Sequence, residues 1–262
     1  MNKLSLVEHL EELRRRLVWS LLFFLGGLLV AFSQRKFFLD LVNAPHRWAM
    51  QHLDLAPSQY VFRYQDAFIS QFKVCLVFGF VLAFPFILHQ ILRFVMAGLF
   101  PQERKKLLYL YLPSFLILFL SGVSFAYFFL VPYGLHFLAL FGTQVGLTPM
   151  INFNEYVSFL LILVLMTGSI FELPVVMALL VRIGMVSALT WRKKQKLAIL
   201  IIFIGAAILT PTPDPLTQTL LAVPLILLYE VGYWVSVWIE KRKLPVTDTS
   251  ISSSSATPFV PE

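Results

Sequence analysis

The chain has 262 residues, of which 58% are hydrophobic and only 13% are charged. Both shares lie far outside the range of water-soluble domains, so a soluble protein is excluded. A transmembrane helix needs about 20 apolar residues, which leaves room for about six spans and short loops. The single cysteine, Cys75, excludes a disulfide framework or a cysteine metal site built from one chain.

The formal net charge of +7 comes from short clusters of Lys and Arg that lie between apolar runs. Proteins that bind nucleic acid gather such residues into one basic patch, so we expect no nucleic-acid partner. Between apolar runs, basic residues mark the loops that stay in the cytoplasm. They precede the first run and follow the second, fourth and sixth runs, which predicts that both termini are cytoplasmic.

In chain order, the apolar runs predict an all-α polytopic membrane protein with one six-helix transmembrane domain over 1–243. We expect an amphipathic surface helix at about 5–16, followed by spans at about 17–33, 67–92, 107–133, 154–181, 197–210 and 216–239. A short extra helix before Pro45 is expected to cap the outer face, because a proline ends most helices. The Ser- and Thr-rich segment 244–262 is predicted to be a disordered cytoplasmic tail.

The fifth span is unusually short. Its apolar run from Leu197 to Thr210 rises only about 21 Å, whereas the hydrocarbon layer is about 30 Å thick. This mismatch predicts a locally thinned bilayer beside the fifth and sixth spans.

Glu172 is the most costly residue of the predicted spans. It lies ten residues before Arg182, which places it about 15 Å from the inner surface and near the midplane. A carboxylate there either carries a proton, pairs with a polar group of another helix, or faces water. A structural alternative is a protonated glutamic acid bonded within its own bundle. Asp214 and Gln218, at the outer end of the last hairpin, either contact a partner helix or, for Asp214, cap the sixth span.

Four carboxylates supply nearly all the negative charge of the basic inner surface: Glu8, Glu11, Glu12 and Glu103. Solvated charges and four-residue-spaced helix pairs, such as Glu12 with Arg16, are the ordinary interpretation. However, a ligand that carries arginines would find few other bidentate partners on this surface.

Catalytic motifs are missing from the sequence. We find no H-E-x-x-H pattern, no G-x-S-x-G elbow and no phosphate loop. We therefore expect a protein that is not an enzyme and that binds neither a metal nor another cofactor.

Four ordered motifs resemble the TatC family, the multispanning subunit of the twin-arginine protein translocase. The motifs are His9 to Leu17, Phe94 to Arg104, Phe171 to Pro174, and Leu209 to Pro224 with Asp214 and Gln218. The resemblance covers the chain up to about Lys243. One departure is Ala97, where family members commonly carry proline.

The resemblance implies a six-helix, glove-shaped bundle of kinked helices that binds the twin-arginine signal peptides of folded substrates at its cytoplasmic face. It implies signal binding by Glu12, Phe94 and Glu103, with the apolar segment of the peptide entering the concave bundle. It also implies a polar site for partner subunits, and a structural proline in the first outer loop. Those positions are Glu172, Asp214 and Gln218 for the partner site, and Pro45 for the loop.

The implied partners are single-span subunits of the TatA and TatB type, further copies in a multimeric receptor complex, and the lipid bilayer. Export would be driven by the proton-motive force across the bacterial inner membrane, with a thylakoid membrane as a second possibility.

The main alternative function is a proton-coupled secondary transporter of a small solute, because a midplane carboxylate also suits that role. The sequence lacks paired interrupted helices in two related halves, which argues against it. A scaffold that assembles partners without recognising signals is a further alternative.

Overall fold

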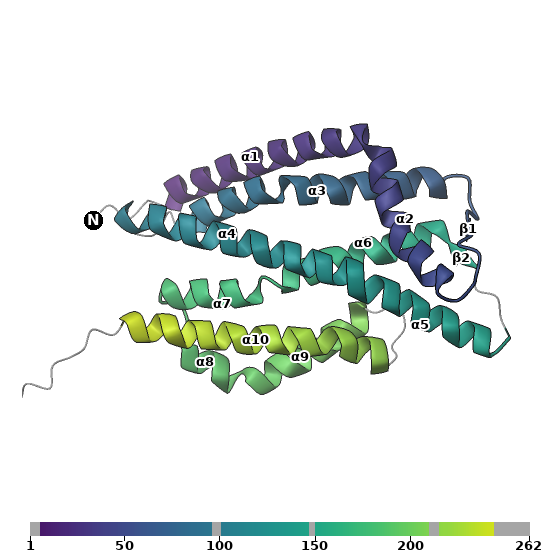
Figure 1. Cartoon of the computed structure of the whole chain (residues 1–262). Helices are drawn as coiled ribbons and strands as arrows, with labels where there is room; N and C mark the ends of the chain where they lie inside the picture. Colours follow the sequence, from purple (N-terminus) through teal and green to yellow (C-terminus); the bar gives the residue numbers. More distant parts are fainter. Residues whose placement is uncertain (1–5, 96–100, 147–149, 210–214, 244–262) are drawn as a thin grey trace, which may run out of the picture.

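The computed structural model describes residues 6–95, 101–146, 150–209 and 215–243, and almost all of them are helical (Figure 1). The elements are α1 (Leu6–Ser33), α2 (Arg35–Gln51), β1 (Gln59–Tyr60), α3 (Asp66–Val95), α4 (Pro101–Phe125), the π-helical turn η2 (Ala126–Leu130), α5 (Val131–Gln144), β2 (Ile151–Asn152), α6 (Phe153–Ile170), α7 (Leu173–Arg182), α8 (Ala188–Lys193), α9 (Gln195–Leu209) and α10 (Pro215–Lys243). The segment 244–262 lies outside the described residues.

Five helical segments of the described chain are long and apolar enough to cross a membrane: α1, α3, α4 with α5, α6 with α7, and α10. The sixth apolar helix, α9, has only 15 residues, so it rises about 22 Å. The protein is therefore an all-α polytopic membrane protein, and α9 corresponds to the short fifth span that the sequence indicates.

The structure differs from the sequence-based prediction at the N-terminus. A separate surface helix was expected at about 5–16, but α1 runs without a break from Leu6 to Ser33. No Gly or Pro interrupts the chain before Gly26, and Leu, Glu and Arg are strong helix formers. The sequence therefore favours one continuous helix from the amphipathic segment into the span.

The third span is also longer than predicted. Its helix continues past 133 through α5 to Gln144, with one π-helical turn at η2. Leu135 and Ala139 of α5 are buried in the core, and α5 packs on α2. An apolar surface that α2 covers thus keeps this segment helical beyond the predicted span.

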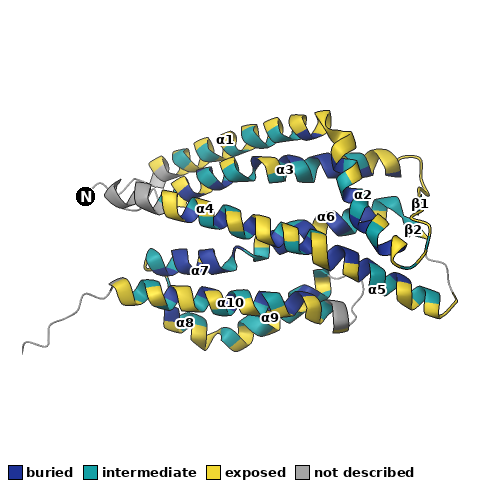
Figure 2. Cartoon of the chain, viewed as in Figure 1, coloured by how far each residue is buried: buried dark blue, intermediate teal, exposed yellow. Residues whose placement is uncertain are grey.

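Within the bundle, α6 takes the central place, with α3 and α4 packed on it and α1 packed along α3 (Figure 1). On the other side, α10 packs against α7 and α9. Buried residues gather on α6 and α7 and on the surfaces that face them, whereas α1 carries a largely exposed outer face (Figure 2). Exposed apolar side chains of this kind suit a surface that faces lipid.

Glycines allow two of these helix pairs to approach closely. A Cβ atom on Gly79 of α3 would lie 2.8 Å from Cα of Leu28 in α1, and Gly27 faces Gly79 across the same contact. Between α4 and α6, a Cβ atom on Gly122 would lie 2.9 Å from Cα of Gly168. Small residues permit such approaches between membrane helices, where dispersion contacts replace the hydrophobic effect as the source of association.

The helix α2 lies across one end of the bundle, which we call the cap end, next to α5 and α3 (Figure 1). It was expected to end at Pro45 but continues through this buried proline to Gln51. A proline has no N–H, so the carbonyl of Leu41 loses its partner within the helix. The hydroxyl of Tyr127 donates to that carbonyl at 2.8 Å, and the Tyr156 hydroxyl donates to the Val42 carbonyl at 2.5 Å.

The two short strands complete the cap end. They pair in parallel, with Gln59 opposite Ile151 and Tyr60 opposite Asn152. They join the loop before α3 to the loop before α6.

Replacing Tyr127 by Phe leaves the Leu41 carbonyl without its donor. We expect this to destabilise the cap by about 1 to 3 kcal/mol, the usual effect of an unsatisfied buried acceptor. Faster amide hydrogen exchange in α2 would report the change. Tyr133→Phe is a matched control, because Tyr133 is about half exposed and removing its hydroxyl leaves no buried acceptor without a donor. Equal exchange in the two variants would contradict the role of Tyr127.

The cap also contains His46, which is 1% exposed. Burial lowers the pKa of His46 from its ordinary value of 6.5, and the nearby Arg47 acts in the same direction. The unfolded chain therefore binds this proton more tightly than the folded chain. Stability from the neutral imidazole is complete above pH 6.5 and is lost as the pH falls below that value.

Lowering the pH from about 7.5 to about 5.5 should therefore reduce the protection of the α2 amides, measured as their exchange rate relative to the intrinsic rate at each pH. His46→Phe, which cannot take up a proton, should remove most of this pH dependence. The same pH dependence in His46→Phe would assign the effect to another group.

Candidate functional site

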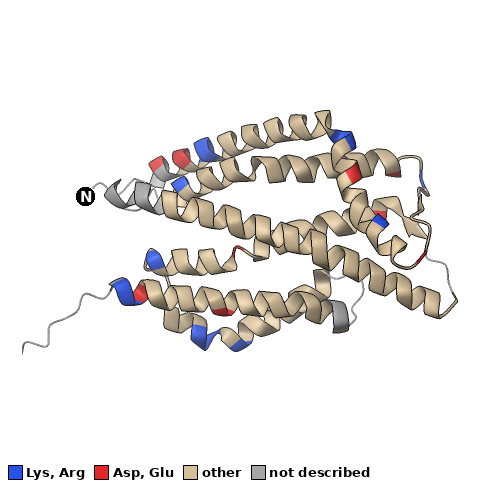
Figure 3. Ribbon diagram, in the orientation of Figure 1, with Lys and Arg blue, Asp and Glu red and all other residues tan. Residues whose placement is uncertain are grey.

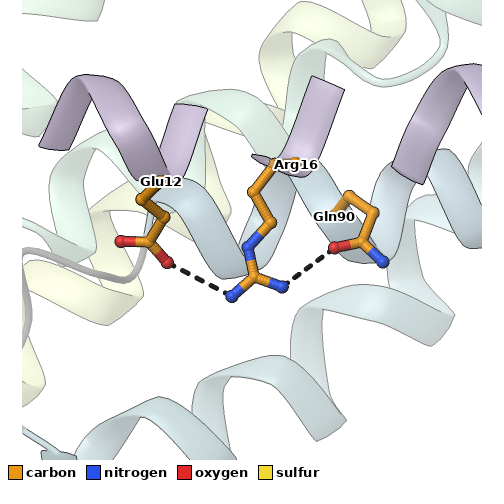
Figure 4. Close-up of polar contacts among 3 residues, drawn as sticks. All are labelled: Glu12, Arg16 and Gln90. Atoms are coloured by element: carbon orange, nitrogen blue, oxygen red, sulfur yellow. Dashed lines mark hydrogen bonds and ion pairs between the residues drawn. The ribbon is translucent and has the colours of Figure 1, made fainter. Parts of the chain in front are cut away.

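The first predicted site lies at the end of the bundle where α1 begins and where α3, α7 and α10 end. We call it the basic end, because Lys and Arg residues gather there (Figure 3). Glu12 lies four residues before Arg16 on α1. The two side chains form an ion pair, with Arg16 Nη2 3.2 Å from Glu12 Oε1. Arg16 Nη1 donates to Gln90 Oε1 of α3 at 2.9 Å (Figure 4).

This contact differs from an ordinary surface pair in its burial. The side chains of Arg16 and Glu12 are 15% and 18% exposed, respectively, and Gln90 is buried. Pairs that are shielded from water are screened less by salt than exposed ones. Glu12 thus already holds one guanidinium, that of Arg16, through Oε1.

Phe94 and Glu103 belong to the same predicted site. Phe94 is half-buried in the last turn of α3, four residues after Gln90 and hence on the same face of the helix. The backbone of Glu103 lies in the first turn of α4, but its side chain is outside the described part of the chain, as is Ala97. The structure thus brings Glu12 and Phe94 to the basic end and gives no position for the Glu103 carboxylate.

Glu172 lies where α6 stops and α7 begins. The amide of Glu172 donates to the Ser169 carbonyl at 3.2 Å, a tightened turn. Pro174 follows in the first turn of α7, the position at which a missing N–H does no harm. The residue is 8% exposed, and neither carboxylate oxygen has a hydrogen-bond partner among the described residues.

A buried polar group without a partner is costly in a membrane. Glu172 therefore has unused capacity to bind a polar group supplied by another molecule. The hydroxyl of Thr167 in α6, which is fully buried, also has no partner within the described residues.

The predicted partner site on the last hairpin is engaged within the chain. Gln218 of α10 donates to the Phe203 carbonyl of α9 at 2.9 Å. At the other end of α9, Gln195 donates to Glu230, and Arg192 lies 3.5 Å from the same carboxylate. Gln218 thus binds α9 to α10, while Asp214 lies outside the described residues.

Sequence reasoning missed a polar cluster nearer the cap end. The Lys73 ammonium of α3 donates to Asn154 Oδ1 at 2.9 Å and to Ser158 Oγ at 2.8 Å, both on α6. Ser70 also donates to Asn154 Oδ1, at 3.2 Å. The available signal was a single lysine inside an apolar run, together with two polar residues spaced four apart in the fourth span.

Metal binding finds no support in the part of the chain that the structure describes. No group of three or more His, Cys, Asp or Glu side chains is arranged there to hold an ion. The polar sites of this protein are suited to hydrogen bonding and ion pairing.

Comparison with known proteins identifies the family. The family described as Sec-independent protein translocase protein (TatC) matches residues 8–224. The TatC protein of Carboxydothermus hydrogenoformans is 36% identical over 241 residues, which cover 92% of this chain and 96% of the relative. The uncharacterized tatC-like protein ycf43 of Pyropia yezoensis is 37% identical over 238 residues, covering 91% of this chain and 90% of the relative.

The fold agrees with this assignment. A crystal structure described as the twin arginine translocase receptor TatC is similar with a TM-score of 0.76 and 34% identity, covering 88% of this chain and 99% of the other. The alternative of a small-solute transporter is not favoured by these relatives. The chain belongs to the TatC family and is a multi-pass core subunit of the twin-arginine translocase, a protein translocase component and not an enzyme.

Proposed function

We propose that this chain is the subunit that receives twin-arginine signal peptides, and that it does so at the basic end. Basic residues gather at the membrane face that remains in the cytoplasm, so the basic end faces the cytoplasm and the cap end faces the opposite side. Residues 1–243 then act as one transmembrane unit. A cytoplasmic membrane is the site that this topology supports, and the tatC-like relative from Pyropia yezoensis keeps a plastid membrane as a second candidate.

The observation that carries the proposal is the binding of Arg16 by Glu12. Arg16 is an internal guanidinium that occupies the carboxylate expected to receive a signal arginine. An incoming arginine can form a charge-assisted hydrogen bond with the same carboxylate, and Arg16 keeps its bond to Gln90 when it yields Glu12. Glu103, at the start of α4, supplies the second carboxylate, because twin arginines need two such acceptors.

Replacing Glu103 by Ala should abolish export of a twin-arginine reporter while the protein remains inserted and abundant. Signal-peptide affinity should fall by about tenfold or more, because a charge-assisted bond is lost. Peptide crosslinking in native membranes, compared for twin-Arg and twin-Lys signals, measures the effect. Glu11→Ala is the matched control, since Glu11 is an exposed carboxylate of the same surface. Normal export by Glu103→Ala would refute this assignment.

A second part of the proposal is that single-span partner subunits bind beside α9 and Glu172. One face of α9 is exposed and apolar, with Leu197, Leu200, Ile201, Ile204 and Ile208, so this face is open to another helix. Glu172 offers two unpartnered oxygens within the described residues, and polar side chains between membrane helices add affinity. The short α9 thins the bilayer locally, which lowers the barrier to a defect during transport.

Crosslinking of a single-span partner to α9 and α10 tests this recruitment. Glu172→Ala should reduce crosslinking about fivefold, as expected for the loss of one bond between membrane helices. This variant keeps the Gln218 bond that joins α9 to α10. The double variant Glu172→Ala with Gln218→Ala should reduce crosslinking further. Thr219→Ala, a neighbouring exposed position, serves as the control. Unchanged crosslinking in Glu172→Ala would exclude Glu172 from the partner site.

The same proposal includes assembly into a multimeric receptor complex and export driven by the proton-motive force. Membership of the twin-arginine translocase supports both steps. The signal and partner sites lie at different places on the bundle, so one chain can hold both ligands at once.

A further inference from the structure

An apolar groove of about 500 Å³ lies between α4, α7 and α10, and none of its described lining residues belongs to α1 or α9. Its walls are mainly aliphatic, with Leu118 from α4, Val175 from α7 and Val235 from α10. Its volume is within the range of ordinary small-molecule sites. A groove with such walls binds an apolar chain better than a polar solute.

Charge is concentrated at one end of this groove. Arg182 and Arg242, at the ends of α7 and α10, both line it. The Arg242 guanidinium lies 3.6 Å from the centre of the Trp238 ring, which also lines the groove. Tyr111 of α4 lines the same site. The polar end thus consists of two cations with aromatic neighbours, the usual surroundings of a lipid headgroup.

The carboxylates of α10 bind groups that do not line the groove. Glu240 accepts a hydrogen bond from the Ala188 amide at the start of α8, and Glu230 binds Gln195 and Arg192. Among the described residues that line the groove, none is acidic. The arginines therefore create a positive end that favours an anion.

The length of the groove identifies the shape of its occupant. Along α10 it extends from Val231 to Arg242, which corresponds to about 16 Å of helix. That is about half of the hydrocarbon thickness of a bilayer. An acyl chain of one leaflet has this reach, whereas a helix that crosses the membrane needs the full thickness.

We propose that this groove binds an anionic phospholipid of the cytoplasmic leaflet, with one acyl chain between α4, α7 and α10 and the phosphate at Arg182 and Arg242. The leaflet follows from the topology proposed above; the site itself does not depend on signal binding. Basic pockets between membrane helices bind acidic headgroups in this manner. The lipid fills the space beside Pro174, directly after the helix break at Glu172.

Native mass spectrometry of the purified full-length protein tests the proposal, with phosphatidylglycerol and phosphatidylcholine as the two probes. The unmodified protein should retain phosphatidylglycerol preferentially. The double variant Arg182→Gln with Arg242→Gln should retain it about tenfold less, because two basic contacts are lost. Lys193→Gln with Lys194→Gln removes two exposed charges at the C-terminal end of α8, outside the groove, and should retain phosphatidylglycerol normally. Equal retention by both double variants would overturn the proposal.

A second variant tests the apolar part without altering charge. Val235→Trp places an indole in the groove from a partly exposed position and should reduce retention of phosphatidylglycerol by a similar factor. Val223→Trp, on the exposed surface of the same helix, should have no effect. Normal retention by Val235→Trp would overturn the proposal. So would a photocrosslinker at Val235 that captures a twin-arginine signal peptide and no phospholipid.

Discussion

Hydrocarbon offers no hydrogen-bond partners, and this constraint determines where the chain can depart from a regular helix. At Pro45, which lies in the cap, the carbonyl that proline leaves free receives the Tyr127 hydroxyl. At the α6–α7 break the backbone closes a tight turn of its own, and Pro174 occupies a position where no N–H is required. The carboxylate of Glu172 is the exception, since no described residue satisfies it. Departures from regular structure are thus compensated within the chain, whereas the polar side chain at the break has no partner among the described residues.

The two proposed sites differ in whether their carboxylate already has a partner within the chain before a ligand binds. Glu12 is occupied by Arg16, so binding of a signal arginine there is an exchange between two guanidinium groups. Glu172 has no such internal substitute among the described residues, so a partner that binds it satisfies a group that was costly before. Exchange favours reversible recognition at the basic end. A hydrogen bond to the previously unsatisfied Glu172 carboxylate favours longer-lived association inside the membrane.

The membrane class, the approximate spans and the short α9 could be predicted from the sequence, because apolar length and loop charge are local properties. The long helix through α5 could not, since it depends on burial of Leu135 and Ala139 beneath α2. The same holds for the site. The position of Glu172 within an apolar run indicated that residue, and the resemblance to TatC singled out Glu12. However, Gln90 pairs with Arg16 across 74 positions of sequence, and no local pattern contains such information.

Two contacts between α1 and α3 have a consequence for the proposed receptor site. The Arg16–Gln90 bond and the close approach of Gly27 to Gly79 are eleven residues apart in each helix. Eleven residues make about three turns, so both contacts lie on one face of an antiparallel pair in the same register. A slide of α1 by one residue would disrupt both at once. The height of Glu12 at the basic end is therefore fixed by a glycine contact about 22 Å deeper in the membrane.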